Sequence, residues 1–207
     1  MTRMLLLRHG QSEWNAAGRW QGQADPPLSD LGRDQAFVAS QKLGTVDAIV
    51  SSDLQRAMHT AQILSGQLGV GPVVIEPLLR EREAGEWSGL TTAEIEEHWP
   101  GYLERGDRPP GFESDDSLLE RLEAALVAIE EQYRGGEVLV VAHGGLVYAL
   151  EREHRRAGPI DRLPNLAGVW LTHHGDRLVL GDRLELIDED PPVEPSAPGW
   201  AATQRVI

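Results

Sequence analysis

The alternation of short apolar runs with segments of helical periodicity constrains the fold of this chain more than any other feature. The apolar runs are three or four residues long and cover residues 4–7, 48–50, 72–75 and 138–141. Runs of this length fit buried strands and are too short for buried helices. Because parallel strands need long crossovers, usually helices, the alternation predicts a mostly parallel central sheet flanked by helices. We therefore expect an α/β fold of three layers.

Three segments between these runs carry the apolar spacing of one helix face. They are residues 29–43, 54–68 and 118–133. Asp53 is the expected N-cap of the second helix, and Ser117 with Glu120 forms an expected capping box for the third. Gly44 is the expected C-cap of the first helix, because glycine readily adopts the left-handed conformation that ends many helices. These helices would supply the crossovers that a parallel sheet needs.

The later part of the chain is less regular. Residues 169–172 and 178–180, separated by His-His-Gly-Asp, predict a hairpin. Residues 105–116 carry glycine, proline and acidic residues and predict a loop. No linker divides the sequence into two cores. We therefore expect one domain over residues 1–187 and an acidic, proline-rich tail over residues 188–207.

The charge balance limits the ligands that the chain can bind. It has 19 Lys and Arg residues against 33 Asp and Glu residues, a formal charge of −14. This excess argues against binding to nucleic acid or anionic membranes, so an anionic ligand needs a local cluster of positive charge. Because the sequence has no cysteine, no apolar run of bilayer length and no signal-peptide pattern, we expect a cytoplasmic protein.

Polar side chains follow three of the apolar runs at the point where each run ends. Arg8 and His9 follow the first, Arg56 lies shortly after the second, and His143 and Gly144 follow the last. In an open parallel sheet the carboxyl ends of the strands share one edge, so these residues can converge there. A glycine follows each histidine and lets the backbone approach a ligand closely. The segments that follow could begin helices whose N-termini favour anions.

Four motifs occur in order along the chain. They are Leu-Arg-His-Gly-Gln-Ser-Glu-Trp-Asn at 7–15, Ser-Ser-Asp-Leu-Gln-Arg-Ala at 51–57, Leu-Arg-Glu at 79–81 with Gly-Glu-Trp-Ser-Gly-Leu-Thr at 85–91, and Val-Ala-His-Gly-Gly at 141–145. Together they resemble the histidine phosphatase superfamily, the phosphoglycerate mutase-like proteins. The resemblance runs from about residue 3 to residue 180, and four motifs at compatible spacing make it specific. It implies the α/β fold of that family.

The resemblance implies a role for each matched position. His9 would be the nucleophile that forms a phosphohistidine, which agrees with the nucleophilicity of a neutral imidazole near pH 7. Arg8, Arg56 and His143 would surround the phosphoryl oxygens and stabilise the charge of the transition state. Further hydrogen bonds to phosphate or substrate are expected from Asn15, Gln21, Gly22 and Gly144.

The same resemblance implies a general acid in the third motif. Glu81 would protonate the leaving alcohol and later deprotonate water, and Glu83 is the rival assignment. We rank Glu81 first because the family pattern places the acid directly after Leu-Arg. Arg82 is a further candidate for contact with an anionic substrate. The chain departs from the family where Ala84 and Gly85 replace a usual aromatic residue.

Two kinds of enzyme share this set of residues. Phosphatases of the family pass the phosphoryl group to water, and mutases return it to another hydroxyl of a phosphoglycerate. The segment between Glu81 and His143 is shorter than the cap that we associate with the mutases, which favours a phosphatase that exposes the phosphohistidine to water. A cofactor-dependent phosphoglycerate mutase and a catalytically silent, phosphate-binding regulatory module remain the alternatives.

The sequence also narrows the expected ligands. Residues 21–23 and 141–146 are similar to actinobacterial members of the family that act on glucosyl-3-phosphoglycerate, so a sugar or glycerate phosphate is the expected substrate. No HExxH or Asp/His metal pattern occurs, and we expect no catalytic metal and no cofactor. The expected partner is a small-molecule phosphomonoester, with no nucleic acid and no membrane, and a homodimer is the oligomeric state to test.

Overall fold

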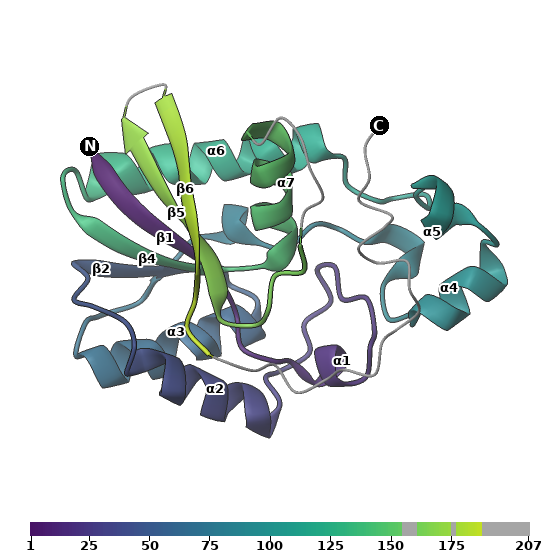
Figure 1. Cartoon of the computed structure of the whole chain (residues 1–207), viewed down its shortest axis with the longest axis horizontal. Helices are drawn as coiled ribbons and strands as arrows, with labels where there is room; N and C mark the ends of the chain where they lie inside the picture. The colour runs from purple at the N-terminus through teal and green to yellow at the C-terminus, as the bar shows by residue number, and fades with distance from the viewer. Residues whose placement is uncertain (155–160, 175–176, 188–207) are drawn as a thin grey trace.

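A six-stranded sheet lies between two layers of helices in the computed structural model, which describes residues 1–154, 161–174 and 177–187 (Figure 1). Helices α2 (Asp30–Ser40) and α3 (Gln55–Leu68) cover one face of the sheet. Helices α6 (Asp115–Gln132) and α7 (Gly144–His154) cover the other. The predicted three-layer α/β fold is confirmed.

The sheet is mostly parallel, with two antiparallel strands at one edge. Its order is β3-β2-β4-β1-β5-β6. The four strands from β3 to β1 run parallel, and β5 and β6 form the predicted antiparallel hairpin beside β1. Residues 175–176, between these two strands in the sequence, lie outside the described residues. The strands are β1 (Thr2–Arg8), β2 (Ala48–Ser51), β3 (Val74–Ile75), β4 (Glu137–Ala142), β5 (Ala167–His174) and β6 (Arg177–Glu185).

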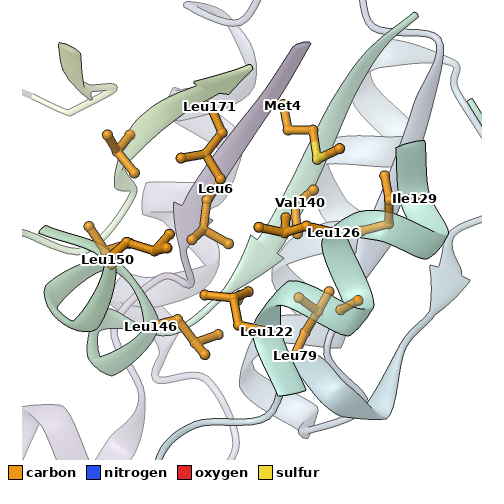
Figure 2. Packing of buried hydrophobic residues seen from close by; sticks show 14 of the residues in the cluster. Met4, Leu6, Leu79, Leu122, Leu126, Ile129, Val140, Leu146, Leu150 and Leu171 are labelled. Carbon is orange, nitrogen blue, oxygen red and sulfur yellow. The ribbon is translucent and has the colours of Figure 1, made fainter. Parts of the chain in front are cut away.

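The central strands β1 and β4 are apolar over residues 4–7 and 138–142, because both of their faces are covered there. Alternate residues of β1 enter opposite cores: Leu6 packs with the α6 and α7 side, and Leu5 packs with the α2 and α3 side. Figure 2 shows Leu6 close to Leu126 of α6 and Leu146 of α7. Burying a side chain of this size stabilises the fold by about 1.5–3 kcal/mol. The site at the end of β1 therefore stands on the most buried part of the sheet.

Helix α3 begins at Gln55 with Leu54 in the N-cap position, so the prediction of Asp53 as its N-cap is wrong. The carboxylate of Asp53 instead binds Arg80, whose Nε lies 2.8 Å from Asp53 Oδ1. This pair joins the second motif to the acid loop, the segment that contains Glu81. The local pattern assigned the Asp53 side chain to a helix cap, but this side chain pairs with Arg80, which is 27 positions away in the sequence.

Two other helix ends differ from their predictions. Helix α6 starts three residues earlier than expected, because Ser114 rather than Ser117 is its N-cap and accepts a hydrogen bond from the Ser117 backbone N–H. Helix α2 ends at Ser40 with Gln41 as C-cap, so Gly44 lies beyond the helix. Two serines, Ser114 and Ser117, lie before the first apolar residue of the helix, and the spacing of apolar residues does not choose between them.

Residues 77–105 contain short helices that the apolar pattern did not predict. Trp87 of one of these helices packs edge to face with two aromatic side chains from outside this range. Its ring centroid lies 5.2 Å from that of Trp20 and 5.8 Å from that of Phe112. This cluster joins the loop after α1 to the acid loop and to the start of α6. The elements concerned are α1 (Glu13–Ala16), η1 (Pro77–Leu79), η2 (Gly85–Trp87), α4 (Thr92–His98) and α5 (Tyr102–Arg105).

Two further predictions concern a loop and the C-terminal tail. The predicted loop over residues 105–116 has no helix between the end of α5 and the start of α6. The predicted tail over residues 188–207 lies outside the described residues. Among the helices that the structure describes, none is long and apolar enough to cross a membrane.

Candidate active site

His9 follows the carboxyl end of β1, and its two ring nitrogens have partners of opposite kind. The His9 side chain is 3% exposed. Its Nδ1 lies 2.6 Å from the Gly10 carbonyl oxygen, and Arg56 Nε lies 3.2 Å from its Nε2. Because a carbonyl only accepts hydrogen bonds and a guanidinium only donates them, these partners place the proton on Nδ1 and the lone pair on Nε2.

The surroundings of His9 keep its ring neutral near pH 7. Its pKa lies well below 6.5, first because the ring is buried and then because Arg56 and Arg8 are positively charged. The hydrogen bond to the Gly10 carbonyl acts in the opposite direction and does not reverse the shift. A neutral ring with its Nε2 lone pair toward a guanidinium has the state that a nucleophile requires.

Arg56 is fully buried in the first turn of α3, and two backbone carbonyls hold its guanidinium. Its Nη1 donates to the Ala24 carbonyl at 2.7 Å, and its Nη2 donates to the Gly22 carbonyl at 2.9 Å. Burial lowers the pKa of Arg56 to about 10, so the side chain stays protonated at neutral pH. Two backbone carbonyls and the Nε2 atom of His9 therefore hold the positively charged guanidinium of Arg56 in place.

Gly22 lies between Arg56 and the acid loop. Its φ is +52°, and a Cβ atom at this position would lie 2.7 Å from the backbone nitrogen of Ala84. The predicted role of Gly22 was phosphate or substrate binding, and the structure places its carbonyl on Arg56. A side chain here would push apart the loop that holds Arg56 and the loop that carries Glu81.

His143 follows the end of β4, and its ring meets that of His9. The two ring centroids are 5.2 Å apart in an edge-to-face arrangement. His143 is fully buried, and its Nε2 lies 3.0 Å from Ser52 Oγ. Its pKa also lies well below 6.5, because of burial first and of Arg56 second. The parallel pairing of β1 with β4 brings these two histidines together, as the sequence predicted.

Arg8 is the last residue of β1 and lies beside the start of α7. Its Nη1 donates to the Leu163 carbonyl. A Cβ atom on Gly144 would lie 3.6 Å from the Arg8 Cδ, so the two residues are neighbours. The predicted positions Arg8, His9, Arg56, His143 and Gly144 thus gather at the carboxyl edge of the sheet.

Glu81 reaches the same edge from the acid loop, and the backbone fixes both of its carboxylate oxygens. Its Oε2 accepts the Gly145 N–H at 3.1 Å, and its Oε1 accepts the Arg82 N–H at 2.7 Å. The Glu83 carboxylate instead stays in its own turn, where Oε1 accepts the Ala84 N–H at 2.9 Å. Of the two rival carboxylates, Glu81 therefore lies beside the turn that carries His143.

Gly145 is a site residue that the sequence analysis missed. A Cβ atom on it would lie 2.1 Å from Glu81 Oε1, so a side chain here would displace the Glu81 carboxylate from its observed position. The double glycine after His143 was the available signal, and we assigned only Gly144. The distance shows that the second glycine makes room for the carboxylate of Glu81.

Asn15 and Gln21 are oriented by Ser12, which is fully buried. Asn15 Oδ1 accepts the Ser12 N–H at 3.2 Å, and Gln21 Oε1 accepts the Ser12 hydroxyl at 2.8 Å. Both amide oxygens therefore face Ser12, and each amide turns its NH₂ group the other way. Asn165 adds a donor that the sequence pattern does not reveal, with its Nδ2 2.9 Å from the His9 carbonyl oxygen.

Arg121 of α6 holds the acid loop in place, and no motif predicted it. Its guanidinium donates to three carbonyls of that loop: Nη1 lies 2.7 Å from Leu78 O and 2.6 Å from Arg80 O, and Nη2 lies 3.0 Å from Glu81 O. Its Nε also binds Glu113 at 2.8 Å. One half-buried cation thus holds the backbone of Glu81 in position.

Arg82 was a candidate for contact with an anionic substrate. In the structure its guanidinium binds other residues of the protein. It binds Asp115 and the Glu113 carbonyl, the latter at 2.6 Å. Arg152 binds the same Asp115 through two hydrogen bonds of 2.6 and 2.9 Å. Two guanidinium groups therefore share one carboxylate. Among the residues that the structure describes, no group of three or more His, Asp or Glu side chains could hold a metal ion.

Comparison with known proteins identifies the family to which this geometry belongs. The sequence profile of the histidine phosphatase superfamily (branch 1) matches residues 4–180. The chain is 41% identical over 182 residues to the glucosyl-3-phosphoglycerate phosphatase of Mycobacterium tuberculosis, with 81% of each chain covered. It is 35% identical over 187 residues to the metal-independent phosphoserine phosphatase of Arabidopsis thaliana, with 86% of this chain and 78% of the relative covered.

A solved structure agrees with the sequence comparisons. The mycobacterial glucosyl-3-phosphoglycerate phosphatase in complex with VO3 superposes with a TM-score of 0.73 at 37% identity, with 86% of this chain and 96% of that chain covered. The resemblance predicted from the four motifs is thereby confirmed. The chain belongs to branch 1 of the histidine phosphatase superfamily.

Proposed function

We propose that the chain is a metal-independent phosphomonoester hydrolase that acts on a small phosphorylated metabolite through a phosphohistidine on His9. The observation that supports this function most strongly is the state of His9. It is neutral and buried, its Nδ1 proton is held by the Gly10 carbonyl, and its Nε2 lone pair lies 3.2 Å from Arg56 Nε. A phosphoryl group that Arg56 binds would lie within reach of that lone pair.

In the first step His9 Nε2 attacks the phosphorus, and the bond from phosphorus to the ester oxygen breaks. Glu81 gives its proton to the departing alkoxide, which leaves as an alcohol. In the second step the ionised Glu81 takes a proton from water, the water oxygen attacks the phosphorus, and the phosphorus–nitrogen bond breaks. His9 recovers its lone pair, and phosphate leaves. The order of proton transfers requires one carboxyl group that acts first as acid and then as base.

Fixed positive charge supplies the stabilisation that a metal gives in other phosphoryl-transfer enzymes. Arg8 and Arg56 would face the phosphoryl oxygens with charges that do not need to reorganise. His143, Asn15 and Gln21 would add neutral donors. The phosphoserine phosphatase of Arabidopsis thaliana that the chain resembles is likewise named as metal-independent.

Hydrolysis is favoured over phosphoryl migration for two reasons. The relatives from Mycobacterium tuberculosis and Arabidopsis thaliana are both named as phosphatases. The segment between Glu81 and His143 is also short, which leaves the phosphohistidine open to water.

A sugar phosphate or glycerate phosphate is the substrate class that we propose. The mycobacterial relative is named for glucosyl-3-phosphoglycerate, whose glycerate part carries a carboxylate as well as a phosphate. We propose Arg108 as the residue that attracts such a second anion. Its guanidinium lies 5.7 Å from the centre of the Trp87 ring and 5.2 Å from that of Phe112. Desolvation lowers its pKa, and so do the charges of Arg82 and Arg152, whereas Asp115 and Asp107 act in the opposite direction.

The decisive experiment for the proposed function measures hydrolysis of p-nitrophenyl phosphate in the presence of EDTA. We expect full activity with the chelator, and a loss of at least about 10³-fold in His9→Ala because the nucleophile is gone. Acid quenching of the wild type should trap a phosphohistidine that His9→Ala lacks. Loss of activity on chelation would overturn the mechanism. Phosphoryl migration on 3-phosphoglycerate would identify a mutase, and no turnover of any phosphomonoester would identify a binding module.

The two candidate acids can be separated by the leaving group. Glu81→Gln should lower kcat/KM for an alkyl phosphate by about 10²–10⁴-fold, because a poor leaving group needs the proton. It should affect kcat/KM for p-nitrophenyl phosphate far less, since p-nitrophenolate leaves without a proton and this ratio does not include the later attack of water, in which Glu81 acts as base. Glu83→Gln is the matched control and should change kcat/KM alike for both substrates. The reverse ranking of the two variants would make Glu83 the acid.

The protonation of His9 is a further prediction, and NMR titration of the imidazole in the free protein measures it. We expect a titration midpoint below the ordinary value of 6.5, because burial and the charge of Arg56 disfavour the protonated ring. Removing the charge in Arg56→Met should raise the pKa of His9, so the neutral fraction at acidic pH falls. Arg33→Met removes an exposed arginine and should leave the midpoint unchanged. A wild-type midpoint at or above 6.5 would contradict the electrostatic account.

Arg108 provides the test of substrate class. Arg108→Ala should raise KM for a phosphate ester that carries a carboxylate by about tenfold, or 1.4 kcal/mol, and leave KM for p-nitrophenyl phosphate unchanged. Arg105→Ala removes an exposed neighbouring arginine paired with Asp107 and serves as the control. Equal effects of Arg108→Ala on both substrates would show that Arg108 does not recognise the carboxylate.

A further inference from the structure

Ser52 is fully buried against His143, and neither the motifs nor the family roles above assign it a function. We propose that Ser52 is a positioning residue that holds His143 in the tautomer with its proton on Nδ1, so that His143 donates Nδ1–H to the phosphoryl group. The inference deepens the proposed function and rests on the same site. It makes the two histidines chemically opposite: His9 presents a lone pair and His143 presents a proton.

The contacts of Ser52 place its hydroxyl at one nitrogen of His143 and at no other titratable group among the described residues. Ser52 Oγ lies 3.0 Å from His143 Nε2. The backbone of Ser52 is fixed as well, because its N–H donates to the Val141 carbonyl at 3.0 Å, two residues before His143. Serine and histidine therefore share one rigid junction between β2 and β4, which leaves little freedom to rotate the ring.

Proton counting decides the direction of this hydrogen bond. The Leu54 N–H donates to Ser52 Oγ at 3.3 Å, so one lone pair of the hydroxyl is used. If the hydroxyl gives its own proton to His143 Nε2, every polar group of Ser52 has a partner. In the reverse direction the hydroxyl would accept twice, and its buried proton would need an acceptor that none of its contacts provides. Burial of an unsatisfied donor costs about 1–3 kcal/mol, which favours the first arrangement.

The other nitrogen of His143 supports the same assignment. His143 Nδ1 is buried and has no hydrogen-bond partner among the residues that the structure describes. A neutral imidazole carries one proton. If Nε2 accepts the hydrogen bond from the Ser52 hydroxyl, that proton must lie on Nδ1. An N–H beside Arg56 and His9 suits a phosphoryl oxygen, whereas a lone pair there would repel it. The orphaned atom is therefore a donor directed at the ligand.

A pair of amide substitutions tests which nitrogen of His143 acts. The amide nitrogen of asparagine takes a position close to Nδ1 of histidine, and that of glutamine a position close to Nε2. His143→Gln should lower kcat/KM by about 10²–10³-fold, the effect of removing one donor to a developing charge. His143→Asn should retain at least about tenfold more kcat/KM than His143→Gln. Equal activities, or a more active glutamine variant, would overturn the proposal.

Nitrogen-15 NMR of the wild-type protein tests the tautomer without any turnover. We expect His143 to carry its proton on Nδ1 and His9 to do the same, with their free nitrogens facing Ser52 and Arg56. Ser52→Ala should give a mixture of His143 tautomers and lower kcat/KM, and Ser52→Thr, which keeps the hydroxyl, should restore both. Ser51→Ala is the control, because the Ser51 hydroxyl donates to the Ser52 carbonyl and not to His143.

The two readouts separate this proposal from the function on which it rests. A wild-type protein that hydrolyses phosphomonoesters but has His143 protonated on Nε2 would overturn the role of Ser52 alone. A protein with the expected tautomers but no phosphohistidine would overturn the hydrolase mechanism alone. Thermal unfolding of each variant identifies any loss that comes from misfolding, and the wild-type spectrum needs no variant at all.

Discussion

The rest of the site depends on the buried positive charge of Arg56. A guanidinium at this depth is stable only because carbonyls and the His9 ring satisfy its donors, and these partners come from different parts of the chain. The requirement therefore joins the end of β1, the loop that contains Gly22, and the start of α3. Burial first, and then this charge, keep His9 neutral by lowering its pKa. Structure and chemistry at this edge of the sheet follow from one desolvated cation.

The two histidines show how similar side chains acquire different uses. Both are buried, both have pKa values well below 6.5, and their rings are in contact. They differ in what lies behind each ring. The carbonyl behind His9 can only accept a hydrogen bond, and the hydroxyl behind His143 can donate one. The proposed difference between a nucleophile and a donor thus lies in one backbone oxygen and one serine, outside the rings themselves.

The sequence predicted the features that depend on local pattern. The apolar runs located the strands, and their ends located Arg8, His9, Arg56 and His143, because a parallel sheet brings strand ends together. Family motifs added the acid loop, and the profile match confirmed that resemblance. These predictions needed no knowledge of long-range contacts.

Features that depend on competition between distant partners were missed or wrong. Asp53 fits a helix cap in sequence, yet Arg80 lies close enough to take its carboxylate. Arg121 is one arginine among many on a helix, and only the fold places it under three carbonyls of the acid loop. Gly145 is required by the position of Glu81, a contact across 64 positions of sequence. No local rule contains the distances that decide these cases.

The contacts of Arg121 have a consequence for how this enzyme can change over evolution. Its neighbours on α6, Leu118 and Leu122, are fully buried in the core, so the packing of that core determines where Arg121 lies. Arg121 in turn determines where the backbone of Glu81 lies. A change in core volume would therefore also move the Glu81 carboxylate, which we propose as the proton donor. In this fold the tolerance of the interior to substitution is limited by the geometry of catalysis.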